Sequence, residues 1–137
     1  MTRSKLQFRV ITDGLKFPEG PIAMADGSVL VVEIEGARLI RVLPDGTKLV
    51  VAELGGGPNG AAIGPDGHCY VCNNGGFNWI EHQDGFLRPH GRADTYEKGG
   101  IQRVNLATGG AEWLYTHCEG NPIMGPNDIV FDKHGGM

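Results

Sequence analysis

The sequence lacks the features that mark membrane and secreted proteins. Among its 137 residues no apolar run approaches the roughly 18 that a membrane-spanning helix needs, so no membrane partner is expected. Residues 1–10 carry charge without an apolar stretch behind it, and they do not resemble a secretory signal. The three cysteines are an odd number, which favours reduced thiols over a disulfide framework and predicts a cytoplasmic protein.

An excess of basic charge is also missing. The chain has 12 Lys and Arg residues against 16 Asp and Glu residues, a net charge of −4, and the basic residues are scattered. Proteins that bind nucleic acids usually gather basic residues into a patch or stripe. The composition therefore argues against a nucleic-acid partner.

Helical periodicity is absent as well, because glycine or proline interrupts every apolar pattern before it extends over a dozen residues. Glycine (23 residues) and proline (8) are instead abundant. Short apolar runs bounded by Gly, Pro, Asp or Asn predict strands joined by tight turns. These runs cover residues 29–32, 39–42, 49–51, 69–72, 101–104, 113–115 and 129–131. The sequence thus predicts an all-β chain of antiparallel hairpins.

The predicted strands follow a repeat. Its three units begin with Glu19-Gly20, Asn59-Gly60 and Asn127-Asp128, and Gly27, Gly67 and Gly135 follow the second residue of each pair by seven positions. The first two pairs lie 40 residues apart, close to the length of one four-stranded propeller blade. The next interval, of 68 residues, predicts a blade with an insertion at residues 78–98, a polar segment with little strand character.

The repeat predicts one partial β-propeller domain over residues 1–137, with units that start near residues 15, 58 and 125. Two blades and the start of a third do not close a ring of four to eight blades. We therefore expect the chain to be the N-terminal part of a longer protein. The segment Leu6–Ile11 then corresponds to the strand that completes the last blade.

The first strand of each propeller blade lines the central channel, so the equivalent residues Glu19, Asn59 and Asn127 are expected to converge on it. One carboxylate and two amide oxygens suit a hard divalent cation such as Ca²⁺, Mg²⁺ or Mn²⁺, and less typically Zn²⁺. The alternative is that Asn before Gly only satisfies the turn geometry ahead of a strand. Because Glu has no such turn preference, Glu19 is the stronger indication of a site.

These motifs resemble the senescence-marker-protein (regucalcin), gluconolactonase and luciferin-regenerating-enzyme family of six-bladed propellers. The matching segments are Phe17-Pro18-Glu19-Gly20-Pro21, Pro58-Asn59-Gly60, Ile101-Gln102-Arg103-Val104 and Gly125-Pro126-Asn127-Asp128. Family members bind one divalent cation through a Glu of the first blade, an Asn of the third, and an Asn and an Asp of later blades. The resemblance implies that Glu19 and Asn127 are metal ligands, with Ca²⁺ as the first expectation.

The same resemblance implies metal-dependent hydrolysis of a sugar lactone. The Asp that serves the family as a base has no counterpart within residues 1–137, so the catalytic residue is unassigned. Asn59 matches no ligand and is expected beside the substrate or behind the ligands, and Asp128 is expected on the substrate side, where it orients its loop. Gly125 stands where some members carry an Arg that holds the substrate, which leaves the lactone unidentified.

Two other functions remain open at this point. The chain is alternatively a cation-binding propeller without catalytic activity, since one fold hosts many functions. It is otherwise a scaffold that pairs with a second copy, because open blade edges favour a homodimer.

Three further segments carry weaker signals. Cys69 and Cys72 lie three positions apart in a predicted strand and so point to opposite faces, which favours packing over a shared metal. In the insertion, Trp79, Phe86 and Tyr96 either stack on a sugar ring or fix the loop to the blade beneath it. The run Gly55–Gly57 is expected to be a flexible connection between blades.

Overall fold

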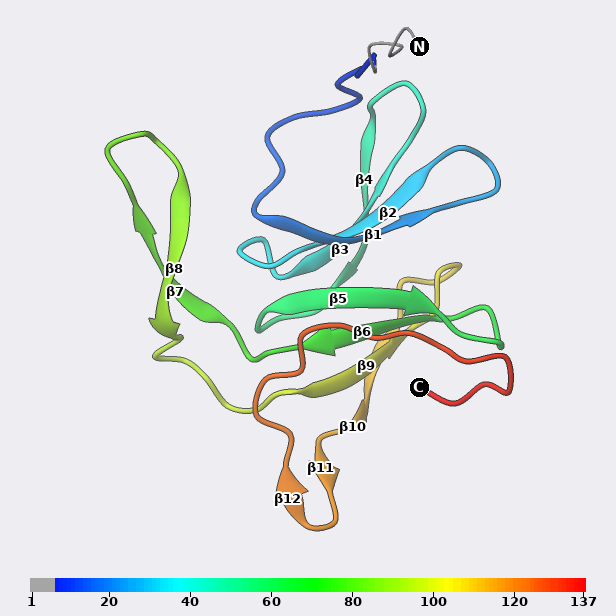
Figure 1. The fold of residues 1–137 in the computed structure, drawn as a ribbon, viewed down its shortest axis with the longest axis vertical. Helices are drawn as coiled ribbons and strands as arrows, with labels where there is room; N and C mark the ends of the chain where they lie inside the picture. Colours follow the sequence, from blue (N-terminus) through cyan, green and yellow to red (C-terminus); the bar gives the residue numbers. More distant parts are fainter. Residues whose placement is uncertain (1–6) are drawn as a thin grey trace, which may run out of the picture.

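The computed structural model describes residues 7–137, and every regular element within that range is a β-strand. The all-β prediction is therefore confirmed. The first sheet consists of β1 (Pro18–Ala23), β2 (Val29–Glu33), β3 (Arg38–Val42) and β4 (Lys48–Glu53), in that order. The second consists of β5 (Pro58–Ile63), β6 (Cys69–Asn73), β9 (Gly100–Val104) and β10 (Ala111–Tyr115). Each sheet is an antiparallel meander of four strands, as a propeller blade requires (Figure 1).

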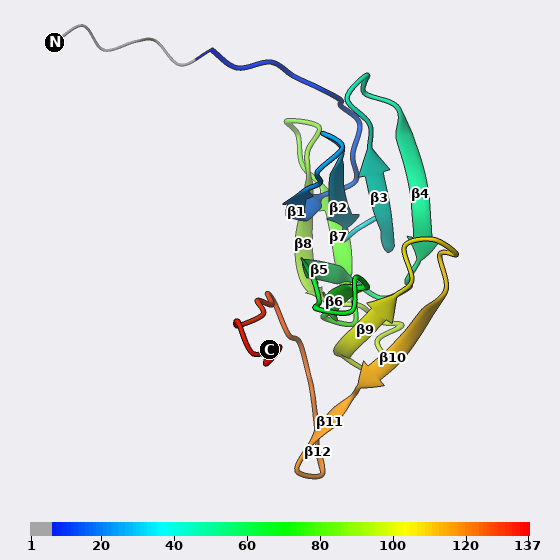
Figure 2. The same cartoon turned by 90° about the vertical axis from the view of Figure 1, so that its right-hand side faces the viewer.

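The two sheets place their strands in the same order from one side of the molecule to the other. Figure 2 shows β1 and β5 on one side and β4 and β10 on the opposite side, with the C-terminal segment on the side of β1 and β5. The strands β1 and β5 are also neighbours in direct contact. They are the inner strands of two consecutive blades, and residues 125–137 begin a third unit next to β5, where Asp128 touches Gly60.

The main hydrophobic core lies between the two sheets. It contains Leu30 and Val32 of β2, Leu39 of β3, Cys69 and Val71 of β6, and Val104 of β9, all of which are fully buried. Val31 and Ile40 alternate with these residues along their strands and form a second cluster on the other face of the first sheet. Burial on both faces explains the unbroken apolar runs, because successive strand residues point to opposite faces.

The first turn of each repeat unit has the same hydrogen bond in all three units. The Met24 N–H donates to the Ser28 carbonyl (2.8 Å), the Gly64 N–H to that of His68 (2.9 Å), and the Asp132 N–H to that of Gly136 (2.8 Å). Gly27, Gly67 and Gly135 occupy the left-handed position of these turns, with φ of 80°, 77° and 83°. The glycine spacing in the sequence thus marks one recurrent turn.

Residues 129–131 do not form the predicted strand. The segment starts against β5, where Asp128 touches Gly60, but no strand of residues 7–137 pairs with it. A strand needs a partner to accept and donate its backbone hydrogen bonds. The segment Leu6–Ile11 also contains no strand from residue 7 onward, and Leu6 lies outside the described residues. The carbonyl of Ile11 lies instead close to Gly46, in the turn between β3 and β4.

The segment between β6 and β9 contains a two-stranded hairpin, β7 (Phe77–Glu81) and β8 (Leu87–Arg92), which projects from the second sheet (Figure 1). The prediction of little strand character was wrong here. The hairpin is mostly exposed, and its polar side chains therefore hide the apolar alternation that marks a half-buried strand. A second short hairpin, β11 (His117–Cys118) and β12 (Asn121–Pro122), precedes the third unit.

Candidate functional site

The inner strands approach each other most closely just after the three equivalent residues Glu19, Asn59 and Asn127. A Cβ placed on Gly20 would lie 2.8 Å from the Ala61 nitrogen, and one on Gly60 would lie 2.6 Å from the Asp128 Cα. Contacts this short leave no room for a side chain at either glycine. The first two units therefore present Glu19 and Asn59 one residue before the place where each touches the next unit.

Both inner strands are irregular at this position. The pairing of β1 with β2 shifts register between Glu19 and Ile22, and that of β5 with β6 shifts between Pro58 and Gly60. A bulge of this kind re-aims the side chains beside it and is frequent next to binding sites. Asn59 lies within the irregularity of β5, whereas Glu19 is the last paired residue before that of β1.

The entry to β1 is held by a buried carboxylate. Glu33, at the end of β2, is 1% exposed and accepts hydrogen bonds from the Lys16 backbone N–H (2.8 Å) and from Arg38 Nε (2.5 Å). The carbonyl of Phe17 accepts a hydrogen bond from the Ile34 N–H (3.0 Å). Phe17 has a φ of 56°, a left-handed conformation that a bulky residue rarely adopts. The segment before Glu19 is thus fixed on both sides.

A cavity of about 340 Å³ lies at the same end of the inner strands. Asn59 and Asn127 both line it, together with Asn74, Phe77, Gly125 and Arg92 among others. Two of the four predicted site residues therefore lie at one cavity. Glu19 is exposed and does not line it.

Asp128 lies elsewhere. It lines a larger cavity, of about 840 Å³, between the second sheet and the C-terminal segment, and its Oδ1 accepts a hydrogen bond from the Ile129 N–H (2.9 Å). Cys72 lines the same cavity, and burial, aided by the negative charge of Asp128, raises the pKa of its thiol to about 11. Asp128 thus shapes the loop after Asn127 and does not face the cavity that Asn127 lines.

The side-chain oxygens of Glu19, Asn59 and Asn127 are donors of the type that a hard cation prefers. Within residues 7–137 the side chains of Glu19, Asn59 and Asn127 form no hydrogen bond or ion pair with the protein, so their oxygens are available. No group of three or more His, Cys, Asp and Glu residues that could hold a metal occurs in the described part of the chain. A cation here would therefore take one carboxylate, of Glu19, and amide oxygens, which is an oxygen-donor set of the kind that Ca²⁺ accepts.

Asn74 is a cavity residue that the sequence analysis did not identify. It follows the last residue of β6, is 9% exposed, and lines the cavity with Asn59 and Asn127. Its Oδ1 accepts a hydrogen bond from the Gly76 N–H (2.8 Å), whereas its Nδ2 is buried without a partner. The only sequence signal was the run Asn73-Asn74-Gly75-Gly76, which indicates a turn and does not distinguish the two asparagines.

The preceding residue, Asn73, has a structural role. It is fully buried, and its Oδ1 accepts hydrogen bonds from the backbone N–H groups of Gly57 (2.9 Å) and Gly75 (3.0 Å). Its Nδ2 donates to the Gly55 carbonyl (2.9 Å) and to Gln102 Oε1 (2.8 Å). The expectation of a flexible connection at Gly55–Gly57 is therefore corrected, because a fully satisfied buried amide fixes this loop.

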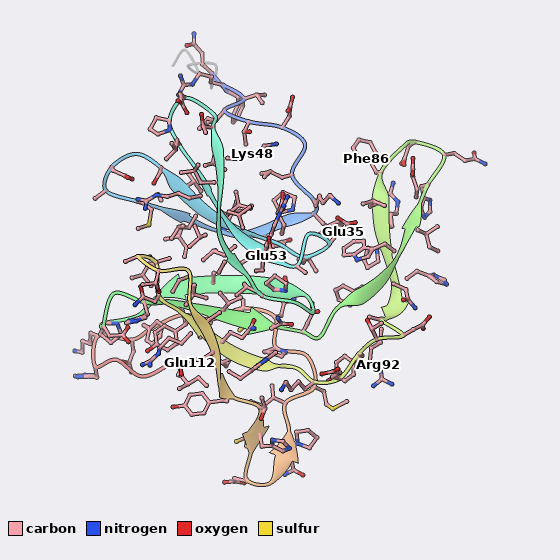
Figure 3. All side chains as sticks on the ribbon, turned by 180° about the vertical axis from the view of Figure 1, so that it is seen from behind. Glu35, Lys48, Glu53, Phe86, Arg92 and Glu112 are labelled. Carbon is pink, nitrogen blue, oxygen red and sulfur yellow. The ribbon has the colours of Figure 1, made fainter. Side chains whose placement is uncertain are left out.

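Two of the three aromatic residues of the insertion fix its position, and none of the three lines the cavity. Trp79 packs between Phe17 and Phe77, with ring centroids 4.9 Å and 6.0 Å apart. The Tyr96 ring contacts Gly75, where no side chain would fit, and its hydroxyl donates to the Met124 carbonyl (2.8 Å). Phe86 is 66% exposed at the far end of the hairpin, away from Arg92 (Figure 3).

The described residues contain no helix long and apolar enough to cross a membrane. Comparison with known proteins agrees with the observed fold. The family model described as the SMP-30/Gluconolactonase/LRE-like region matches residues 17–137. No curated protein matches the sequence significantly.

Two solved structures resemble the chain. A gluconolactonase from Xanthomonas campestris superimposes with a TM-score of 0.64 at 21% sequence identity, over 88% of this chain and 33% of its own. A gluconolactonase candidate solved by a structural genomics consortium gives a TM-score of 0.65 at 20% identity, over 93% of this chain and 37% of its own. The chain thus spans about a third of the length of these structures, and the likeness shows the shared propeller fold.

Proposed function

The chain belongs to the SMP-30/gluconolactonase/LRE-like family, and from this premise we propose that it carries the N-terminal part of a metal-dependent lactonase site. The substrate class is a sugar lactone. The observation that supports the proposal best is the placement of Asn59 and Asn127 at one cavity, at the end of the inner strands where Glu19 also stands.

Glu19 and Asn127 are the proposed cation ligands of this chain. Their oxygens are not engaged by other residues within 7–137, so binding a cation would break no internal contact. A divalent cation bound there would polarise the lactone carbonyl and stabilise the negative charge that develops on its oxygen. Ca²⁺ is the proposed ion, with Mg²⁺, Mn²⁺ and Zn²⁺ as alternatives.

The remaining cavity residues would bind and orient the lactone. Asn59 can donate and accept hydrogen bonds with ring hydroxyls, as a polyhydroxylated substrate requires. Phe77 offers an apolar wall against the C–H groups of the ring. The proposed role of Asp128 is indirect, because its side chain bonds to the Ile129 N–H and shapes the loop that carries Asn127.

Hydrolysis also requires a base that accepts a proton from the attacking water. The proposal assigns no residue of this chain to that step. We therefore expect the 137-residue chain alone to hydrolyse lactones very slowly, and the protein that carries this segment within a complete propeller to hydrolyse them efficiently.

The test is lactone hydrolysis by the complete propeller protein, followed by acid release with glucono-δ-lactone as substrate. We expect a chelator to abolish turnover and Ca²⁺ to restore it. Glu19→Gln should lower kcat/KM at least 100-fold, whereas Glu81→Gln, an exposed carboxylate on β7, should leave it unchanged. Cation binding without turnover would instead identify a non-catalytic cation-binding propeller.

A further inference from the structure

We propose that Arg92 and Asn74 form an anion-binding subsite in the 340 Å³ cavity, and that this subsite selects lactones that carry a carboxylate substituent. The proposal rests on the lactonase function proposed above and specifies its substrate class. It depends on two side chains from different segments that line the same cavity and have hydrogen-bond donors without a partner in the described chain.

The first donor is the side-chain amide of Asn74. The residue is more than nine-tenths buried, and its Nδ2 has no hydrogen-bond partner within the described chain. The orientation of the amide is fixed, because its Oδ1 must face the N–H of Gly76. A buried N–H₂ group without a partner destabilises the fold, and a hydrogen bond to a ligand oxygen would relieve this.

The second donor is the guanidinium of Arg92, at the end of β8. Ion pairs in the described part of the chain involve Arg38, Arg41, Arg88 and Arg103, but not Arg92. The charge of Arg92 is thus without a counter-ion within residues 7–137. It is the one charged residue among those that line the cavity, so no carboxylate there would repel an anion.

Arg92 is also held in place at the cavity. Its guanidinium carbon lies 4.8 Å from the centre of the Tyr96 ring, and Tyr96 is itself fixed by Gly75 and by the carbonyl of Met124. Stacking of a guanidinium on an aromatic face leaves its edge free for hydrogen bonds. Met124 lines the cavity as well, so this stack stands at the cavity wall.

A carboxylate matches these donors in charge and geometry. The planar guanidinium binds both oxygens of a carboxylate side by side, and a neutral amide N–H can add a third hydrogen bond. A phosphate carries a charge of about −1.5 to −2 and would need more than this single cation. The cavity has room for a six-carbon sugar lactone, and the acid group at one end of the molecule would set its orientation.

The experiment compares two lactones of the same ring size that differ in one group. Glucono-1,4-lactone ends in a neutral hydroxymethyl group, and glucaro-1,4-lactone carries a carboxylate in its place. Binding of each to the purified protein is measured by calorimetry, and the Asn74 side-chain amide is followed by ¹⁵N NMR. We expect the acidic lactone to bind at least tenfold more tightly and to shift the Asn74 amide resonance.

Arg92→Gln tests the role of the guanidinium. Because Arg92 is exposed, we expect this variant to fold like the parent chain and to lose the preference for the acidic lactone. Arg88→Gln is the matched control, since Arg88 lies on the same strand, pairs with Asp84 and does not line the cavity. It should retain the preference.

The outcomes separate this inference from the lactonase proposal. Equal affinity for the two lactones, or a preference that survives Arg92→Gln, would overturn the subsite. If the complete protein still hydrolyses the neutral lactone, the lactonase proposal stands without it. Tight, Arg92-dependent binding of the acidic lactone without hydrolysis of either compound would support the subsite and contradict the hydrolase. No binding of either lactone would overturn the subsite.

Discussion

Gly60 lies directly against the backbone of Asp128, and a Cβ in its place would lie 2.6 Å from both the Asp128 Cα and its Oδ1. This contact joins the inner strand of the second unit to the start of the third. Gly20 has the corresponding contact with the backbone at Gly60 and Ala61. The side chains that precede these contacts are thereby brought to one end of the inner strands.

Gly60→Ala should loosen this junction. The added methyl group would press on backbone atoms, which move less easily than a side chain, and overpacking of this kind costs about 1–3 kcal/mol. We expect a loss of that size in the free energy of unfolding, measured by urea denaturation. Gly125→Ala is the control, because the nearest atoms to its Cβ would be 4.0 Å away. Equal stability of the two variants would contradict the close contact.

The stability of the chain should decrease in acid because of turn carboxylates. Hydrogen bonds from the Ser28 hydroxyl and the Ser28 N–H lower the pKa of Asp26 below its ordinary 3.8, and those from Thr47 do the same for Asp45. A lowered folded-state pKa stabilises the fold above the unfolded value, and this contribution is lost as the pH falls through the folded value. The urea concentration at the unfolding midpoint should therefore decrease when the pH is lowered below about 4.

The double variant Asp26→Asn/Asp45→Asn tests this cause. Asparagine can still accept the turn hydrogen bonds but does not titrate, so the decrease in stability with acid should be shallower than in the parent. The Asp13 side chain accepts no hydrogen bond in the described chain. The control variant Asp13→Asn should therefore lose stability with acid as steeply as the parent. A parallel pH profile for the double variant would exclude these two carboxylates as the cause.

The three cysteines should differ sharply in reactivity. Cys118 is exposed, whereas Cys69 and Cys72 are buried, and burial raises the pKa of their thiols to about 12 and about 11. Because the thiolate is the reactive form, we expect one cysteine to react with a thiol reagent in the native protein and three after denaturation. Cys118→Ser should abolish the native-state reaction. Rapid labelling of that variant would show that the second sheet opens.

The fold was predictable largely because its repeat is local. The runs at residues 29–32 and 69–72 and the glycines at 27 and 67 report strands and turns that form within one unit. Residues 129–131 show the same pattern but form no strand, since a strand also depends on a neighbour that the sequence pattern does not supply. Local signals thus predicted the strands of the two four-stranded sheets, and the presence of a pairing partner decided whether a predicted strand formed.

The site was predictable only where the repeat marks it. Asn59 and Asn127 follow from their equivalence, but Asn74 and Arg92 do not, because each reaches the cavity through contacts between distant segments. Asn73 and Asn74 are adjacent and identical in type. The side chain of Asn73 forms four hydrogen bonds, whereas the Nδ2 of Asn74 has no partner in the described chain. Their different roles depend on Gly55–Gly57 and Gln102, whose positions no spacing along the chain reveals.

Cation binding by this chain should be detectable as a gain in thermal stability that depends on Glu19. A ligand that binds only the folded state stabilises it by RT ln(1 + [L]/Kd), so millimolar Ca²⁺ should raise Tm and excess chelator should reverse the rise. Glu19 is exposed and makes no internal hydrogen bond or ion pair in the described chain, so Glu19→Gln should leave the Tm without Ca²⁺ unchanged while reducing the Ca²⁺-dependent rise. Glu81→Gln should preserve that rise, because this carboxylate lies on the inserted hairpin. An equal rise in the Glu19→Gln variant would place the cation elsewhere and remove Glu19 from the proposed ligands.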